Sequence, residues 1–190
     1  MKRELKTAFW MTIVTTIVFG LIYPVVVTGL AQLFFPIQAN GELVRKNDTV
    51  IGSQLIGQAF SQPGYFHSRP SSAGTGYDGL NSGGSNLGPT NQQLISRIEA
   101  DVKKLHSENP GAPIPVDLVT TSASGLDPDI SPAAAEFQIP RVALERGITE
   151  SELRELIRER TEGRQFRVLG EPRVNVLELN QELDKRHPMR

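Results

Sequence analysis

The chain has 190 residues, 38% of them hydrophobic, and a formal net charge of −1 at pH 7. Because it carries no excess of cations, it lacks the basic footprint that is typical of nucleic-acid-binding proteins. Because it contains no cysteine, disulfides and thiolate metal sites are excluded as well.

An uncharged and mainly apolar run dominates the N-terminal part of the chain. It extends from Thr7 to Phe35, and no charged residue follows before Glu42. A helix of about 27 of these residues would rise roughly 40 Å, which exceeds the roughly 30 Å hydrocarbon core of a bilayer. The sequence therefore predicts one transmembrane helix over residues 8–35.

The charges that precede this run predict how the chain is oriented in the membrane. Lys2, Arg3 and Lys6 stand against a single carboxylate, Glu4. Since short cation-rich segments remain in the cytoplasm, residues 1–7 are predicted to be cytoplasmic. Residues 36–190, with a net charge of about −3, would then form a periplasmic or otherwise extracytoplasmic domain of a protein of the inner (plasma) membrane.

A cleaved signal peptide is the alternative interpretation of the apolar run. Gly29, Leu30 and Ala31 resemble a small-residue cleavage site. However, the apolar region of a signal peptide usually spans only about 7–15 residues, whereas here Leu33 to Phe35 continue the run beyond that site. The pattern favours a retained anchor.

The predicted anchor carries residues that favour close helix packing. A small, hydroxyl or helix-bending residue recurs every four positions, at Thr12, Thr16, Gly20, Pro24 and Thr28. Small residues let a second helix approach closely, and hydroxyl groups can bond across the contact. We interpret this series as a packing face for a partner helix, with Pro24 bending the helix. Ordinary anchors also contain such residues, so this alternative stays open.

The pattern after the anchor predicts an α+β domain with a small sheet and several helices. Strand patterns occur at residues 52–60 and 114–121. Helices are predicted from Thr90, with Gln93 completing a capping box, and from Ser131, with an interruption at Pro140 and an end at Gly147. One more is predicted from Thr149, with Glu152 in a capping box, until Gly163. Residues 174–183 could form a strand or a helix, and Asn175 as a cap favours a helix. The Thr149 helix would bury Leu153, Leu156 and Ile157.

Residues 61–90 form a long segment of unusual composition. Seven glycines, three prolines and six serines occupy thirty positions, with Tyr65, Phe66 and Tyr77 among them. A flexible linker would not need aromatic residues, and structureless loops of this length are uncommon in compact domains unless they are functional. We expect an ordered loop that presents backbone groups to a ligand or partner.

The residue types that usually carry catalysis or metal binding are poorly placed for either. His67, His106 and His187 lack neighbours at metal-ligand spacing, so no metal site is predicted. Ser122 and Ser124 lack the surroundings of a nucleophile elbow, so no catalytic residue is predicted.

Two short motifs remain as candidates for binding. Asp127 and Asp129 could attract a cation or, more commonly for such a pair, form a turn before a helix cap. The stretch Ser82, Gly83, Gly84, Ser85 and Asn86 resembles a γ-phosphate-contacting signature and could cradle an anion. Because no Walker motif accompanies it, a tight turn is favoured.

Several longer segments together resemble a known family along essentially the whole chain. They are Gly-Gln-Ala-Phe at 57–60, Tyr-Phe-His-Ser-Arg-Pro at 65–70, and the segments 82–89, 115–135 and 169–176. These segments resemble the C subunits of Kdp-type potassium-transporting ATPases. The resemblance implies partnership with a channel-like potassium-binding subunit, a P-type ATP-hydrolysing subunit and a small single-helix subunit.

The resemblance implies an accessory role in high-affinity, ATP-driven potassium uptake, with no chemistry of the subunit's own. The family is commonly described as a catalytic chaperone that raises the ATP affinity of the P-type subunit. ATP and potassium would then be handled by the complex, and no cofactor is expected to bind this chain directly. An external domain could influence ATP only allosterically. The interpretation we favour is that the subunit stabilises the complex and caps the external channel mouth. If Asp127 and Asp129 line a vestibule there, they would shape or supply potassium at that mouth, although a turn remains the favoured use of this pair. An independent membrane-anchored binding or sensor module is the alternative.

Overall fold

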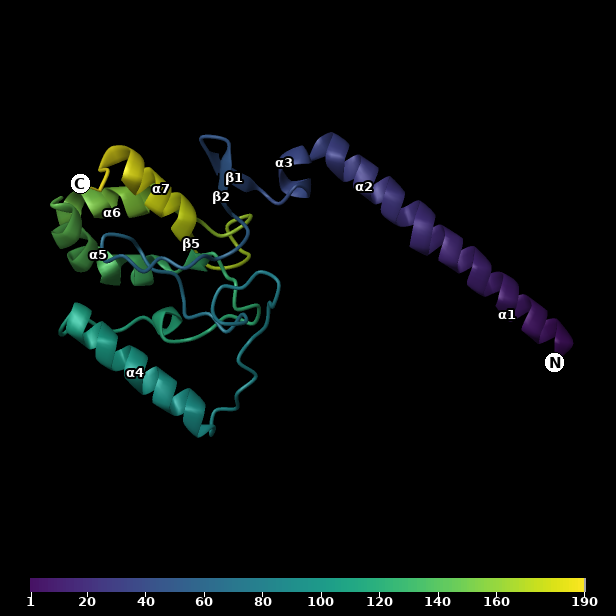
Figure 1. The fold of residues 1–190 in the computed structure, drawn as a ribbon, viewed down its shortest axis with the longest axis horizontal. Coiled ribbons are helices and arrows are strands. Elements are labelled where there is room, and N and C mark those ends of the chain that lie inside the picture. Colours follow the sequence, from purple (N-terminus) through teal and green to yellow (C-terminus); the bar gives the residue numbers. More distant parts are fainter. Residues whose placement is uncertain (190) are drawn as a thin grey trace. The chain divides into compact units, whose positions relative to one another are not determined.

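The fold was analysed in a computed structural model, which describes residues 1–189 without the side chain of Lys46 (Figure 1). The chain divides into two compact units, Met1–Ile51 and Gly52–Arg190, which are described separately.

The first unit begins with the predicted apolar helix. Helices α1 (Lys2–Thr15), η1 (Thr16–Ile22) and α2 (Tyr23–Phe34) are continuous, and together they form a 33-residue helix that contains an 18-residue window with a mean hydropathy of 2.2. It is long and apolar enough to cross a membrane, and every one of its side chains is accessible within the chain itself. A helix of this composition needs lipid or other helices as its surroundings.

Pro24 disturbs this helix through a wide turn rather than a sharp kink. The seven residues of η1, immediately before it, are π-helical. Proline has no N–H to donate to the carbonyl four positions back, and its ring crowds the preceding turn. A wider π turn makes room for the ring without breaking the helix. The ribbon accordingly stays continuous from α1 into α2 (Figure 1).

The rest of the first unit is short and leads into a small hairpin. Helix α3 (Pro36–Ala39) is followed by β1 (Leu43–Lys46) and β2 (Thr49–Ser53), which form a two-stranded sheet. Asn47 and Asp48, between the strands, both have positive φ values, of 50° and 61°. The predicted strand at 52–60 is wrong beyond Ser53, because the chain turns there and then follows an irregular path.

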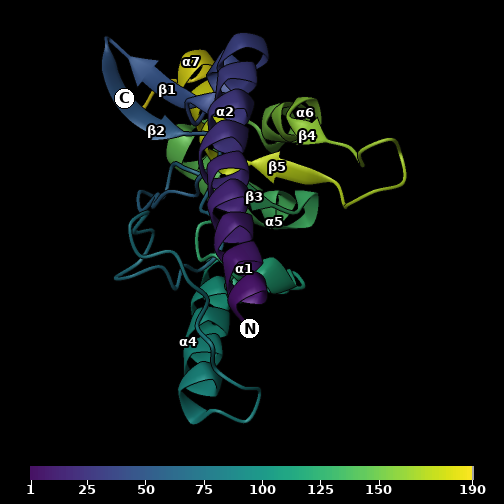
Figure 2. The same ribbon diagram turned by 90° about the vertical axis from the view of Figure 1, so that its right-hand side faces the viewer.

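A three-stranded antiparallel sheet and three helices surround the core of the second unit. The strands β3 (Asp129–Ile130), β4 (Thr161–Glu162) and β5 (Arg173–Asn175) are arranged in the order β3-β5-β4. Helices α5 (Pro132–Arg146), α6 (Glu150–Glu159) and α7 (Val176–Arg186) lie beside this sheet (Figure 2). They contribute most of the buried apolar side chains, to which the long loop adds Phe66. The predicted α+β class, with a small sheet and several helices, is confirmed.

The local sequence determines the ends of these helices well. Thr149 and Glu152 form the predicted capping box of α6, which buries Leu153, Leu156 and Ile157 as expected. Helix α6 ends at Glu159, however, before the predicted stop at Gly163. Asn175 caps α7 by accepting a hydrogen bond from the backbone of Glu178.

Helix α5 corrects a prediction, because it continues through Pro140 as one element. Ser131 caps its start, and Gly147 in the left-handed conformation ends it. Phe137, Ile139 and Val142, on both sides of the proline, are all buried. Burying each such side chain contributes about 1.5–3 kcal/mol, so together they outweigh the roughly 3 kcal/mol cost of an internal proline.

Two further predictions fail near α4 (Gln92–Glu108). Asn91, not Thr90, caps this helix, because its side chain accepts hydrogen bonds from Gln93 and Leu94. The predicted strand at 114–121 is instead a single 3-10 turn, η2 (Val116–Leu118). Asp117 in this turn accepts two hydrogen bonds from Ser131 and so ties η2 to the start of α5.

Candidate functional site

The 61–90 loop contains no helix or strand, yet two buried side chains hold its backbone. The amide of Asn180, on α7, accepts a hydrogen bond from the Phe66 N–H at 2.8 Å and donates to the Phe66 carbonyl at 2.9 Å. Gln138, on α5, does the same for His67 at 2.8 and 3.1 Å. Each amide thus supplies the donor and the acceptor that a neighbouring strand would offer.

A buried arginine fixes the start of the same loop. Arg146, on α5, donates to the carbonyls of Gly64 and His187, each at 2.7 Å, and pairs with Asp184 at 2.8 Å. Its guanidinium carbon lies 4.7 Å from the ring centre of Tyr65, whose hydroxyl donates to Asp184. Burial and the bond to Asp184 raise the pKa of Tyr65, so its hydroxyl keeps the proton that it donates. The loop, α5 and α7 are therefore joined at one point.

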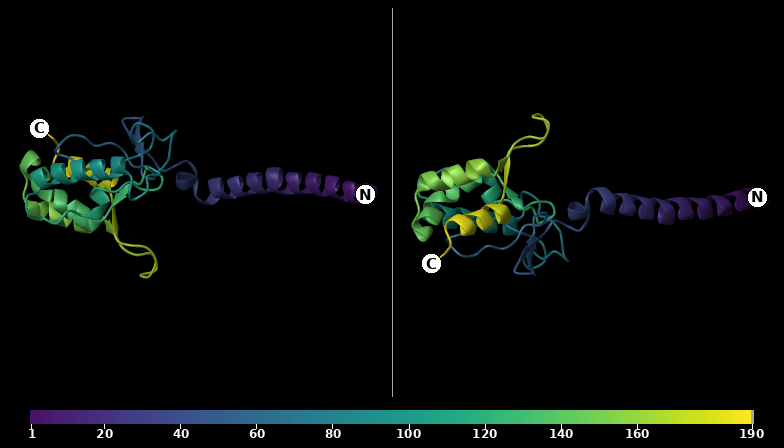
Figure 3. Two further views of the ribbon diagram at one scale, coloured as in Figure 1. Left: turned by 90° about the horizontal axis from the view of Figure 1, so that it is seen from below. Right: turned by 90° about the horizontal axis from the view of Figure 1, so that it is seen from above.

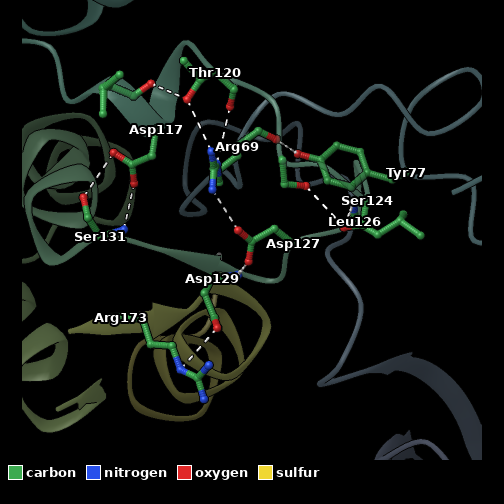
Figure 4. Close-up of polar contacts among 12 residues, drawn as sticks. Arg69, Tyr77, Asp117, Thr120, Ser124, Leu126, Asp127, Asp129, Ser131 and Arg173 are labelled. Atoms are coloured by element: carbon green, nitrogen blue, oxygen red, sulfur yellow. Dashed lines mark hydrogen bonds and ion pairs between the residues drawn. The ribbon is translucent and has the colours of Figure 1, made fainter. Parts of the chain in front are cut away.

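Arg69 connects the middle of the loop to the segment before β3 (Figure 4). Its guanidinium pairs with Asp127 at 2.9 Å and donates to the carbonyl and hydroxyl oxygens of Thr120, at 3.4 and 3.3 Å. The hydroxyl of Tyr77 donates to the carbonyl of Arg69 itself. A planar guanidinium with several donors suits this role, because it can bridge two separate chain segments at once.

The first two residues of the Ser82-to-Asn86 stretch are bonded to the backbone of Ser124. The Ser82 hydroxyl and the Gly83 N–H both donate to the carbonyl of Ser124, at 3.0 and 2.8 Å. Gly84 lies close to the backbone that precedes Ser124, and Asn86 has a positive φ of 53°. Two donors that could contact a phosphate are therefore already engaged, as the tight-turn interpretation expects.

Gly125 is the position where this stretch approaches the 120–130 segment most closely. It has a φ of 68°, and a Cβ atom there would lie 2.6 Å from the Ala73 nitrogen and 2.7 Å from the Gly83 oxygen. Its carbonyl accepts a hydrogen bond from the Ser71 hydroxyl at 2.6 Å. Only glycine combines this backbone conformation with this lack of space.

Both members of the acidic pair have cationic partners. The two oxygens of Asp127 accept from Arg69 and, at 3.1 Å, from the backbone N–H of Asp129. Asp129 lies 3.4 Å from the guanidinium of Arg173, and its burial raises its pKa above the usual aspartate value (Figure 4). The bond between the two residues is the side-chain-to-backbone contact of an Asx turn, which favours the turn interpretation over a free cation site.

A cleft of about 340 Å³ lies between the 61–90 loop and α4. Arg69, Lys104, Asp101 and Glu108 are the charged residues that line it, and His67 lies at its wall. Burial, assisted by the nearby charge of Arg141, lowers the pKa of His67, whose ring contacts the Gln62 carbonyl at 3.1 Å. Among residues 1–189, no three His, Asp or Glu side chains are grouped to hold a metal ion.

The predicted packing series lies on the apolar helix, where all five positions are accessible or nearly so. The hydroxyl of Thr12 donates to the carbonyl of Ala8 at 2.9 Å, so its hydrogen bond is made within the helix. The position of Gly20 is open, with only a methyl group of Thr16 within 4 Å of where a Cβ would be.

The residues that hold the 61–90 loop could not be found by motif. Gln138 and Asn180 lie 71 and 114 positions from the residues that they bond. The available signal was weak: each is a neutral polar residue within the apolar face of a predicted helix, Gln138 beside Phe137 and Asn180 beside Leu179. Such residues require a partner when they are buried.

One helix that is long and apolar enough to cross a membrane, followed by an α+β domain whose long loop is held by its other elements, is typical of a single-span membrane protein. The family model described as "KdpC: K+-transporting ATPase, c chain" matches residues 5–185. Potassium-transporting ATPase KdpC subunits are similar over nearly the whole length of both chains. The relative from Koribacter versatilis is 60% identical, covering 100% of this chain and 98% of its own.

Two further relatives agree. The KdpC subunit of Acidobacterium capsulatum is 57% identical over 97% of this chain and 100% of its own length. That of Bradyrhizobium diazoefficiens is 51% identical over 97% and 98% of the two chains. The chain belongs to the KdpC family, the non-catalytic C subunits of the Kdp potassium-transporting ATPase, whose partners are KdpA, KdpB and KdpF.

Proposed function

We propose that this subunit acts from outside the cytoplasm, as a preformed platform that stabilises the assembled pump beside its channel-like subunit. The N-terminus would remain in the cytoplasm, as the excess of Lys2, Arg3 and Lys6 over Glu4 supports. The apolar helix would pack against a partner helix along the face of Thr12, Thr16, Gly20, Pro24 and Thr28, where Gly20 leaves room for close approach.

The carrying observation is that the long loop is held at fixed points by groups from the rest of its domain. Asn180, Gln138 and Arg146 bond its backbone from residue 64 to residue 67, and Asp127 pairs with its Arg69. Gly125 and Ser124 receive its later part. A loop ordered in this way loses little further entropy on docking, which is what a structural contact surface requires.

The catalytic-chaperone description of the family concerns ATP affinity, and the Ser82-to-Asn86 stretch is its natural candidate. In the proposed topology this stretch lies across the membrane from cytoplasmic nucleotide. The bonds of Ser82 and Gly83 to Ser124 support a structural use instead. Any influence on ATP would then be a coupling free energy of about 1–3 kcal/mol transmitted through the partner subunits.

The possible vestibule role of Asp127 and Asp129 is a narrower part of the proposal. Because Arg69 and Arg173 pair with them, they would add little net negative potential at a channel mouth. Asp127→Asn with Asp129→Asn should raise the apparent KM for potassium only modestly, since exposed charges are screened within about 8 Å. A shifted ATP dependence with unchanged potassium dependence would contradict this and favour nucleotide coupling.

Thiol labelling in intact cells tests the topology directly, because the natural chain has no cysteine. Thr75→Cys, at an exposed position of the loop, should react with a membrane-impermeant maleimide once the outer envelope is permeable. Leu5→Cys, in the segment predicted to be cytoplasmic, is the matched control and should react only after lysis. If instead the Leu5→Cys variant reacts in intact cells and the Thr75→Cys variant reacts only after lysis, the proposed topology is wrong and direct contact with cytoplasmic nucleotide becomes the better explanation.

Packing of the anchor is tested by Gly20→Leu. A large side chain at this open position should block close helix approach and lower the recovery of partner subunits on the tagged chain. Val25→Leu, a substitution at another exposed position of the same helix, is the control. If both variants recover the full complex, the series at 12–28 has no role in packing.

An independent binding or sensor module is the second candidate, and the 340 Å³ cleft is the observation in its favour. Both cationic and anionic side chains line it, as would suit a small zwitterionic solute. Expressed without partner subunits, such a module would stay intact and bind solute, whereas a subunit would be degraded or inert.

A further inference from the structure

A projecting apolar loop connects the last two strands of the second unit. Residues 163–172, here called the tip loop, join β4 to β5 and extend away from the other elements of the domain in two perpendicular views (Figures 2 and 3). Phe166 is 89% exposed, Val168 73% and Leu169 58%. Three large apolar side chains exposed so close together, at the end of a projection, are uncommon on a surface that faces only water.

The tip loop is nevertheless well formed by its own hydrogen bonds. The backbone groups of Gln165 and Leu169 bond each other reciprocally, with both N···O distances at 2.9 Å. The N–H of Val168 also donates to the Gln165 carbonyl at 3.1 Å. The apolar side chains are thus presented on a closed turn, whose shape does not depend on the rest of the domain.

The turn is occupied by unusual residues for its conformation. Phe166 and Arg167 have φ values of 51° and 64°, a left-handed pair that Asn and Gly normally fill in hairpins. Bulky residues adopt this conformation at a cost, and such strain concentrates at functional sites. Asn and Gly would form this turn at a lower free-energy cost. We therefore infer that the side chains of Phe166 and Arg167 serve a function other than folding.

The charges around the turn favour a protein surface over a lipid one. Arg164 pairs with Glu171 at 2.5 Å, and Arg173 pairs with Glu162 at 2.8 Å, so each cation on the stem carries a carboxylate beside it. Anionic lipid would be repelled by these carboxylates. Arg167 adds one positive charge next to the aromatic ring, and Arg and aromatic residues are enriched at the centres of protein interfaces.

We propose that the tip loop is a docking knob, whose Phe166 enters an apolar pocket with an acidic rim on a partner subunit of the potassium-transporting ATPase. Val168 and Leu169 widen the apolar contact, and Arg167 meets the acidic rim. The proposal rests on the assembly role proposed above, and it adds a second contact surface besides the 61–90 loop and the chemistry that receives it.

Site-specific photo-crosslinking in the assembled complex identifies the occupant. Phe166→p-benzoylphenylalanine should crosslink on irradiation to one partner subunit, at a position identified by mass spectrometry beside apolar and acidic residues. Leu144→p-benzoylphenylalanine, an 82% exposed control on α5, should not reach that position. Crosslinks from 166 only to lipid, only to a second copy of this chain, or to no partner subunit would overturn the proposal.

A second variant removes the knob but keeps the turn. Phe166→Asn with Arg167→Gly suits the left-handed pair, so the hairpin should still form. We expect the half-life of the purified complex in detergent to fall roughly tenfold or more, as for loss of an aromatic anchor. An unchanged half-life would overturn docking by these side chains. Because Thr75→Cys labelling is independent of both experiments, failure of the knob and failure of the proposed topology are distinguishable.

Discussion

Two irregular segments of the same domain are ordered in opposite ways. The 61–90 loop is rich in glycine and serine, but buried amides and guanidinium groups from α5 and α7 bond its backbone. The tip loop bonds mainly itself and leaves Phe166 exposed. From composition alone, the glycine-rich 61–90 loop would be expected to be the more flexible of the two. Their hydrogen bonds show a different distinction: the order of the 61–90 loop depends on groups from other elements, and the order of the tip loop depends mainly on its own backbone. The first should fail when distant residues change, and the second should not.

The largest effect is expected at the buried amide of α7. Asn180→Leu leaves both the N–H and the carbonyl of Phe66 buried without a partner. Since each of the two unpaired buried groups costs about 1–3 kcal/mol, the free energy of unfolding should fall by about 2–6 kcal/mol. Urea unfolding of the full chain in detergent, followed by near-UV circular dichroism, measures this. Gln93→Leu on exposed α4 is the control, and equal effects of the two variants would contradict the assignment.

A smaller loss is expected where the loop meets the 120–130 segment. Gly125→Ala places a Cβ against the backbone of Ala73 and Gly83 at a positive φ, which should cost about 1–3 kcal/mol. Loosening the loop should also speed chymotryptic cleavage after Tyr77, which is followed by Asp78. Gly163→Ala, where a Cβ meets nothing within 4 Å, is the matched control. Unchanged cleavage in Gly125→Ala would show that this contact does not order the loop.

The pH dependence of the free energy of unfolding should reveal the burial of His67 in the 61–90 loop. Burial lowers the pKa of His67 in the folded chain, so the unfolded chain binds the proton more readily. His67 therefore contributes stability above its unfolded pKa of about 6.5, and this is lost as the pH falls toward the folded value. Unfolding free energies at a series of pH values should show a shallower decline for His67→Gln than for His106→Gln, an exposed control on α4. Equal slopes would refute the assignment.

The tip loop should give the smallest effect on stability. Phe166→Asn with Arg167→Gly removes no contact with the rest of the domain and relieves two left-handed bulky residues. The unfolding free energy should stay unchanged or rise by up to about 1 kcal/mol. A loss greater than about 1 kcal/mol in the same urea experiment would show that these side chains support the fold.

Local patterns predicted the elements whose causes are local. The capping box of Thr149 and Glu152 and the apolar face of α6 lie within nine residues of each other. The local sequence therefore contains all the residues that determine them. Pro140 misled the prediction because the gain that preserves α5 comes from burial against other elements. The strand patterns at 52–60 and 114–121 failed because apolar residues in a short segment do not say whether a partner strand exists.

The candidate site was predictable only in part for the same reason. The aromatic residues of the 61–90 loop correctly indicated order, but the groups that impose it, Gln138, Asn180 and Arg146, are supplied by distant helices. Asp127 and Asp129 were singled out by their charge, yet their cations, Arg69 and Arg173, lie 58 and 44 positions away. Sequence shows which groups need partners and leaves the choice of partner to the fold.

The bond between Phe66 and Asn180 also sets an order of events during biosynthesis. Asn180 follows Phe66 by 114 residues, so the loop has no amide to bind until α7 has been synthesised and has reached the same side of the membrane. Until then its glycine-rich backbone remains unfolded. The platform formed by the 61–90 loop is therefore completed late, which would act as a checkpoint: a nascent or truncated chain without α7 offers its partners no finished platform.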